Sequence, residues 1–210
     1  MTEEEAPRIS PGGGRGAGRR PPRKPSPQSL DNAAQYYLAR YAASAESLRR
    51  VLRRRVDRAA RAHGDVDVQA AHGWIEDIIR RYLASGLLND ALFAAARART
   101  LHRRGASARL IREKLAIKGL DTATVDAAIA AIEPEEDGGD RELEAARALA
   151  RRRRLGPWRR PGQRAEARMR DLAALARAGF AYDVCKAVVD GPAGDGSGSD
   201  GGGPEEDGNA

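Results

Sequence analysis

The 210-residue sequence is poor in the residues that build disulfides, aromatic cores and membrane spans. Only 4% of residues are aromatic, and the single cysteine, Cys185, excludes an internal disulfide and fits a reducing compartment. No stretch approaches the ~20 consecutive apolar residues of a membrane helix. The acidic, then Gly- and Pro-rich N-terminus does not resemble a signal peptide. We therefore expect a cytoplasmic protein that does not bind membranes.

The sequence also lacks the clusters that catalysis requires. The three histidines, His63, His72 and His102, are scattered, and none is paired with Cys or Glu at ligand spacing, whereas a zinc site needs about four such ligands. The Gly-rich residues 12–18 lack the Gly-Lys-Ser/Thr ending of a phosphate loop. Cys185 lies among valines, as a small core residue would. We expect no catalytic residue, no metal, no cofactor, and hence no enzyme.

Both ends of the chain differ in composition from its middle. Residues 1–29 are rich in Pro, Gly and Arg, and residues 191–210 are almost entirely Gly, Asp, Glu, Ser and Pro. Neither can bury enough apolar surface to offset the entropy of ordering it. We predict a disordered basic leader over 1–29 and a disordered acidic tail over 191–210. The remaining 161 residues, 30–190, hold 31 basic and 22 acidic side chains, a net charge of +9.

The middle of the chain is dominated by the helix formers Ala, Leu, Arg and Glu. No stretch alternates apolar and polar residues with period two, so the pattern predicts an all-α fold. Apolar residues three and four apart indicate nine short helices. Their expected N-caps include Asp31, Ser44, Asp65, Asn89 or Asp90, Ser107 and Asp121, and their expected stops include Gly64, Gly86, Gly105, Gly119 and Gly179.

One segment occurs twice and indicates an internal repeat. Around Gly119, a Leu stands four residues before the glycine and an apolar residue directly after it, and the same holds around Gly179. That apolar residue can fold back on the helix end in a Schellman-type contact. We predict three tandem three-helix repeats, at about 30–87, 88–133 and 138–190, stacked into an elongated, curved array. The alternative is an ordinary helical bundle with accidental similarity.

Basic residues gather at similar points of the three repeats. In the second helix, arginines spaced four apart lie outside the apolar face. Further basic clusters lie at 103–118 and 151–160. A single cluster is explained as a solvated helix face, but three favour a stripe that meets phosphate or an acidic surface. No aromatic residues interleave with them, so we expect non-specific contacts. The predicted partner-binding residues are Arg49, Arg50, Arg53, Arg54, Arg103, Arg104, Arg109, Arg112 and Lys118.

A set of short motifs resembles one known family. Residues 86–90 read Gly-Leu-Leu-Asn-Asp, 93–94 Phe-Ala, 103–107 Arg-Arg-Gly-Ala-Ser and 118–120 Lys-Gly-Leu. In this order they resemble the RecX family, regulators of the RecA recombinase. The family has Tyr where Leu87 stands and Asp where Asn89 stands. The resemblance covers about residues 30–190 and is strongest over 86–129.

The resemblance implies a fold of three tandem three-helix repeats and a regulator that needs no cofactor. It implies binding in the groove of the RecA filament on single-stranded DNA, which limits filament growth, ATP hydrolysis, strand exchange in homologous recombination and co-protease activity in the SOS response. We expect a monomer whose arginines meet acidic RecA surface and, non-specifically, single-stranded DNA. The alternative is a helical protein that binds single-stranded nucleic acid independently of RecA.

Overall fold

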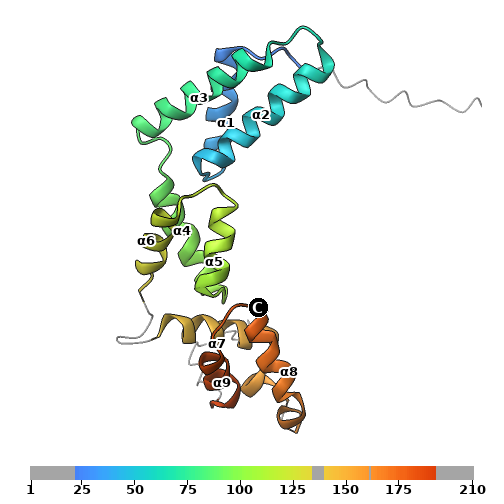
Figure 1. The fold of residues 1–210 in the computed structure, drawn as a ribbon, viewed down its shortest axis with the longest axis vertical. Coiled ribbons are helices and arrows are strands. Elements are labelled where there is room, and N and C mark those ends of the chain that lie inside the picture. Colours follow the sequence, from blue (N-terminus) through green and yellow to red (C-terminus); the bar gives the residue numbers. More distant parts are fainter. Residues whose placement is uncertain (1–21, 134–139, 161, 193–210) are drawn as a thin grey trace, which may run out of the picture. The chain divides into compact units, whose positions relative to one another are not determined.

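The computed structural model describes residues 22–133, 140–160 and 162–192, and in this part of the chain every regular element is helical (Figure 1). The all-α prediction is confirmed. The α-helices are α1 (Pro27–Leu38), α2 (Ala45–Ala62), α3 (Val68–Ala84), α4 (Asp90–Arg103), α5 (Ala108–Ala116), α6 (Thr122–Ala130), α7 (Arg141–Arg153), α8 (Arg164–Arg177) and α9 (Tyr182–Asp190), with a short 3-10 helix η1 (Gly156–Trp158).

The chain forms two compact units. The first unit combines the chain up to Arg40 with Leu48–Arg81, and the second combines Tyr41–Ser47 with the chain from Tyr82 onward. The first turn of α2 therefore belongs to the second unit. Residues 1–21, 134–139, 161 and 193–210 lie outside the described residues, so the disordered leader and tail remain predictions.

In the first unit, α2 contributes the apolar face that its spacing predicts. Its fully or almost fully buried side chains are Leu48, Leu52, Val56 and Ala59. Two helix starts differ from the prediction. α1 begins at Pro27 rather than after Asp31, because Ser26 and Ser29 form a capping box, so its first turn lies within the predicted leader. α3 is capped by Asp67, which accepts from the Ala70 N–H at 2.9 Å, whereas Asp65 pairs with Lys24.

The second unit contains two three-helix groups that repeat one design. Counting helices in chain order, α1–α3 are the first group, α4–α6 the second and α7–α9 the third. The second and third groups each have a hydrophobic core of their own. The predicted repeat signal marks the end of the middle helix in both. Gly119 and Gly179 have positive φ, and the Leu120 and Phe180 amides donate back to Leu115 and Leu175 in the Schellman pattern. The predicted role of these glycines is therefore confirmed.

Arg141, at the start of α7, joins the third group to the second. Its Nη1 donates to the carbonyls of Ile129 and Ala130 at 3.0 and 2.9 Å, at the end of α6. The last carbonyls of a helix lack the usual partner four residues on, although Ile129 also accepts from the Ile132 N–H at 3.1 Å, and a cation there meets the negative end of the helix dipole. The Arg141 carbonyl in turn accepts from Nε2 of buried His102 at 2.8 Å. His102 thus has a structural contact.

Candidate partner-binding surface

The seven arginines of α2 divide into two kinds. The buried apolar face of this helix is opposite Arg50, Arg54 and Arg61, because residues four and eleven apart return to the same side of an α-helix. Arg49 and Arg53 lie instead at the edge of the apolar face, next to α3. One helix therefore presents two sets of guanidinium groups with different surroundings.

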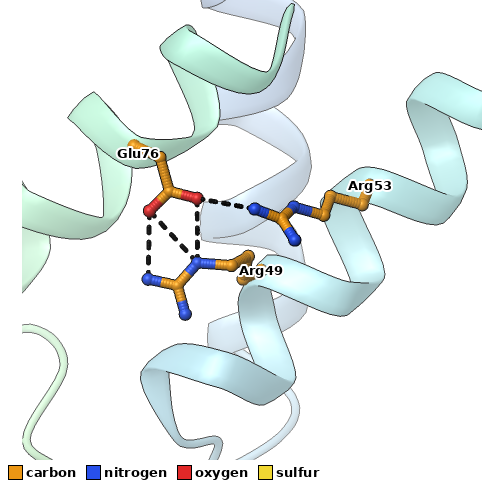
Figure 2. A network of polar contacts seen from close by, with 3 residues as sticks. All are labelled: Arg49, Arg53 and Glu76. Carbon is orange, nitrogen blue, oxygen red and sulfur yellow. Dashed lines mark hydrogen bonds and ion pairs between the residues drawn. The ribbon is translucent and has the colours of Figure 1, made fainter. Parts of the chain in front are cut away.

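Arg49 and Arg53 converge on one carboxylate of α3, as Figure 2 shows. Arg49 Nε lies 2.9 and 3.1 Å from the two oxygens of Glu76, Arg49 Nη2 lies 3.0 Å from Oε2, and Arg53 Nη2 lies 3.1 Å from Oε1. The hydrogen bonds from Arg49 lower the pKa of Glu76, although partial burial opposes this. The network ties α2 to α3, so these two predicted binding residues already have an internal partner.

The outer arginines of α2 are exposed. Within the described chain, Arg54, Arg58 and Arg61 have no hydrogen-bond or ion-pair partner, and Asp57 is the one acidic side chain of α2 beyond its first turn. Arg50 is exposed on the same side. Arg61 was missed in the sequence, although its spacing of seven from Arg54 placed it in the same row. Together, Arg50, Arg54, Arg58 and Arg61 form the outer row, four exposed arginines on one side of α2.

The predicted basic residues of the second unit are partly neutralised. Arg109 pairs with Glu113 at 2.9 Å, and Arg112 pairs with Asp126 at 2.8 Å, which links α5 to α6. Arg103 and Arg104, at the end of α4, are exposed. Lys118 is half-buried; its carbonyl accepts from Ser44, which leaves its ammonium group unengaged by that bond. Of the four arginines, Arg103 and Arg104 are the more available to a partner, because Arg109 and Arg112 form ion pairs.

The third arginine cluster also contains both exposed arginines and an arginine that pairs internally. Arg151–Arg154 are exposed at the end of α7, although Arg152 Nη1 donates to the Arg104 carbonyl at 2.6 Å. Arg159 instead forms two hydrogen bonds to Asp171, at 2.7 and 2.6 Å. Arg49 to Arg54 belong to the first unit and the other predicted residues to the second, so the alignment of all clusters into one stripe remains a prediction.

The described residues contain few other groups that could bind a metal ion or take part in a reaction. No group of three or more His, Cys, Asp or Glu among them is placed to hold a metal ion. Cys185 is fully buried in the core of the third group, and burial raises the pKa of its thiol, as expected for a packing residue. No helix in this part of the chain is long and apolar enough to cross a membrane.

These features define a class: a helical protein of consecutive three-helix groups that displays clusters of exposed arginine. A family model described as RecX, second three-helix domain, matches residues 89–129. The regulatory protein RecX of Myxococcus xanthus is 46% identical over 170 residues, which cover 80% of this chain and 88% of the relative. The chain belongs to the RecX family of regulatory proteins.

More distant relatives agree. The regulatory protein RecX of Streptomyces coelicolor is 34% identical over 116 residues, covering 54% of this chain and 57% of that protein. A crystal structure of a regulatory protein RecX superposes with a TM-score of 0.56 at 21% identity, covering 79% of this chain and 72% of the other. At that identity the superposition supports the fold of repeated three-helix groups and not a particular binding residue.

Proposed function

We propose that this protein modulates the RecA recombinase, mainly as an inhibitor. It binds the RecA filament as a monomer and limits filament growth together with the ATPase, strand-exchange and co-protease activities of RecA. It thereby regulates DNA repair and the SOS response in the cytoplasm, without catalysing a reaction. Membership of the RecX family carries this proposal, and the exposed arginines supply a surface suited to an acidic partner.

The effect of the full chain on RecA filaments is the first property to test. The experiment follows the ATPase rate and filament length of RecA on single-stranded DNA, with the full chain added in stoichiometric amounts. The wild-type chain should shorten filaments and lower the ATPase rate. Unchanged filaments and an unchanged ATPase rate would contradict the proposed function.

Charge reversal separates surface contacts from net charge. The pair Arg54→Glu with Arg61→Glu, and separately Arg103→Glu with Arg104→Glu, should weaken RecA inhibition about tenfold, since each reversal replaces attraction by repulsion. The control pair is Arg97→Glu with Arg99→Glu on α4, which changes net charge equally at exposed positions outside the predicted set. An equal loss in all three pairs would show that net charge alone matters.

Replacing Glu76 should strengthen partner binding, whereas the charge reversals should weaken it. Glu76→Gln releases Arg49 and Arg53 from their internal ion pair, so affinity for an acidic partner should rise about threefold, while the first unit loses less than about 1 kcal/mol of stability. The matched control is Asp77→Asn, which removes one negative charge from the exposed Arg80 pair on the same helix. Equal gains in the two variants would contradict a role for Arg49 and Arg53.

The second candidate is binding to single-stranded nucleic acid without RecA. The exposed arginines favour it, because guanidinium groups bind phosphate and release counterions. Binding to a fluorescent single-stranded oligonucleotide, titrated with salt in the absence of RecA, distinguishes the two. Tight binding with a steep salt slope, combined with no effect on RecA beyond competition for DNA, would favour this candidate.

A further inference from the structure

Two serines of the described chain combine a helix cap with a contact far along the sequence. Ser44 precedes α2 and Ser107 precedes α5, and both are fully buried. Their hydroxyl oxygens lie 3.2 and 3.3 Å from the amide nitrogens of Ser47 and Leu110, which is ordinary N-capping. The same hydroxyls donate to carbonyls 74 and 71 residues later, Lys118 at 2.6 Å and Ala178 at 2.7 Å.

The residue after each serine repeats the arrangement. The Ala45 N–H donates to Asp90 at 2.8 Å, and the Ala108 N–H donates to Glu142 at 2.7 Å. Each carboxylate lies in the first turn of the opening helix of the following group, α4 or α7. A carboxylate at a helix N-terminus is favourable because it meets unpaired N–H groups and the positive end of the dipole.

The acceptor carbonyls immediately precede the repeated glycines. Gly119 and Gly179 have φ values of +76° and +98°, and a Cβ on either would collide with the preceding group. At Gly119 it would meet the Glu46 side chain, and at Gly179 it would lie 2.7 Å from Ser107 Oγ. Glycine is therefore required twice, for the backbone conformation and for the close approach of the two helix ends.

Other caps in the described chain lack this second contact. The side chains of Asn89 and Asp121 accept from the amides of Leu92 and Thr124, three residues on. α8, the middle helix of the third group, has no side-chain cap, and Gln163 stands at its N-cap. A shared serine thus occurs at the two middle helices that are followed by another three-helix group.

We propose that Ser44 and Ser107 are positioning residues that couple each middle helix to the end of the next one. One hydroxyl completes the N-terminal cap of one helix and holds the C-terminal turn of another, so neither end frays alone. The second and third groups therefore order together. The consequence for RecA rests on the proposed function: these serines keep the exposed arginines of the second unit in place without touching the partner.

Native-state hydrogen exchange of the full chain tests the coupling. Ser107→Ala should speed exchange about tenfold at the Leu110 amide, which loses its cap, and equally at the Gly179 and Phe180 amides at the end of α8. The control Asn89→Ala removes a local cap and should speed exchange around Leu92 alone. Faster exchange at Leu110 with Gly179 and Phe180 unchanged would overturn the proposal.

The other serine provides a second variant, should Ser107→Ala not fold. Ser44→Ala should speed exchange at the Gly119 and Leu120 amides, and unchanged rates there would also overturn the proposal. RecA inhibition is measured on the same variants, with greater loss expected for Ser107→Ala than for Asn89→Ala. Unchanged inhibition together with faster exchange at Gly179 would overturn the expected consequence for RecA and leave the coupling intact, whereas a wild-type chain that does not inhibit RecA would contradict the proposed function alone.

Discussion

Replacing Asp171 by alanine should unfold the third helical group at temperatures at which the wild-type chain is stable, with a loss of about 3 kcal/mol. The Asp171 carboxylate is only 1% exposed, and it accepts from the Gly156 N–H at 2.8 Å and from Arg159 Nε and Nη2 at 2.7 and 2.6 Å. The variant leaves a backbone donor and a partly buried arginine without their acceptor. Thermal denaturation followed by circular dichroism measures the loss.

The matched control is a second ion pair made by α8. Arg168 on α8 forms two hydrogen bonds to Asp190 at the end of α9, but both side chains are more than a third exposed. Asp190→Ala should therefore cost less than about 1 kcal/mol, because water replaces the lost partner. A similar loss of stability in both variants would show that burial of the Asp171 pair is not what stabilises the third group.

The same carboxylate should make the stability of the third group depend on pH. Burial alone would raise the pKa of Asp171, but the hydrogen bonds from Arg159 and Gly156 outweigh it, and nearby Arg170 adds to them, so its pKa is lowered. A lowered folded-state pKa gives stability that is present above the unfolded value of about 3.9 and is lost as pH falls through the folded value.

The stability difference between wild type and Asp171→Asn should accordingly shrink as the pH falls below about 4. Urea denaturation of both proteins between pH 3 and 7 measures it. Other carboxylates with lowered pKa, such as Glu76 and Asp190, are present in both proteins, and their contribution cancels in the difference. A difference that is constant over this range would contradict the assigned ion pair.

Replacing Gly105 by alanine should destabilise the second unit by about 2–5 kcal/mol. Gly105 ends α4 with a φ of +78°, which costs a residue with a Cβ about 1–2 kcal/mol. The new Cβ would also lie 2.5 Å from the Leu149 backbone nitrogen and 2.8 Å from its Cα in α7. Because backbone atoms inside a helix cannot move aside, the overlap adds about 1–3 kcal/mol.

Gly86 separates these two contributions. It has nearly the same φ, +74°, but a Cβ there would meet nothing within 4 Å. Gly86→Ala should therefore show the conformational cost alone, about 1–2 kcal/mol. Chemical denaturation of both variants gives the comparison, and an equal loss of stability would mean that α4 and α7 do not approach each other closely at Gly105.

Much of the local structure could be predicted from the sequence because helix caps and stops act over three to six residues. Ser44, Asn89, Ser107 and Asp121 cap the helices that follow them, and Gly119 and Gly179 end helices as expected. The start of α1 was missed because the composition of residues 1–29 concealed the capping box at Ser26. The α3 cap was misplaced because two aspartates stand two residues apart before that helix.

The division of the arginines could not be predicted. Helical spacing separates Arg49, at the edge of the apolar face of α2, from Arg50 and Arg54, but nothing in the sequence shows that Glu76, 27 residues away, faces that edge. Likewise, Arg159 belongs to a basic run in the sequence but serves a buried carboxylate in the third group. An ion pair depends on which helix faces the side chain, so the available arginines emerge only once the helices are packed.

The sequence by itself determined the helical class, the glycine stops and the resemblance to the RecX family, because periodicity, capping and motifs depend on residues that are close together in the sequence. Only the tertiary structure decided that Ser107 reaches Ala178, that Asp171 holds Arg159, and that Arg54 and Arg61 have no partner among the described residues. These pairings bring together atoms far apart in the chain, and helix packing, rather than local preference, sets the distances between them.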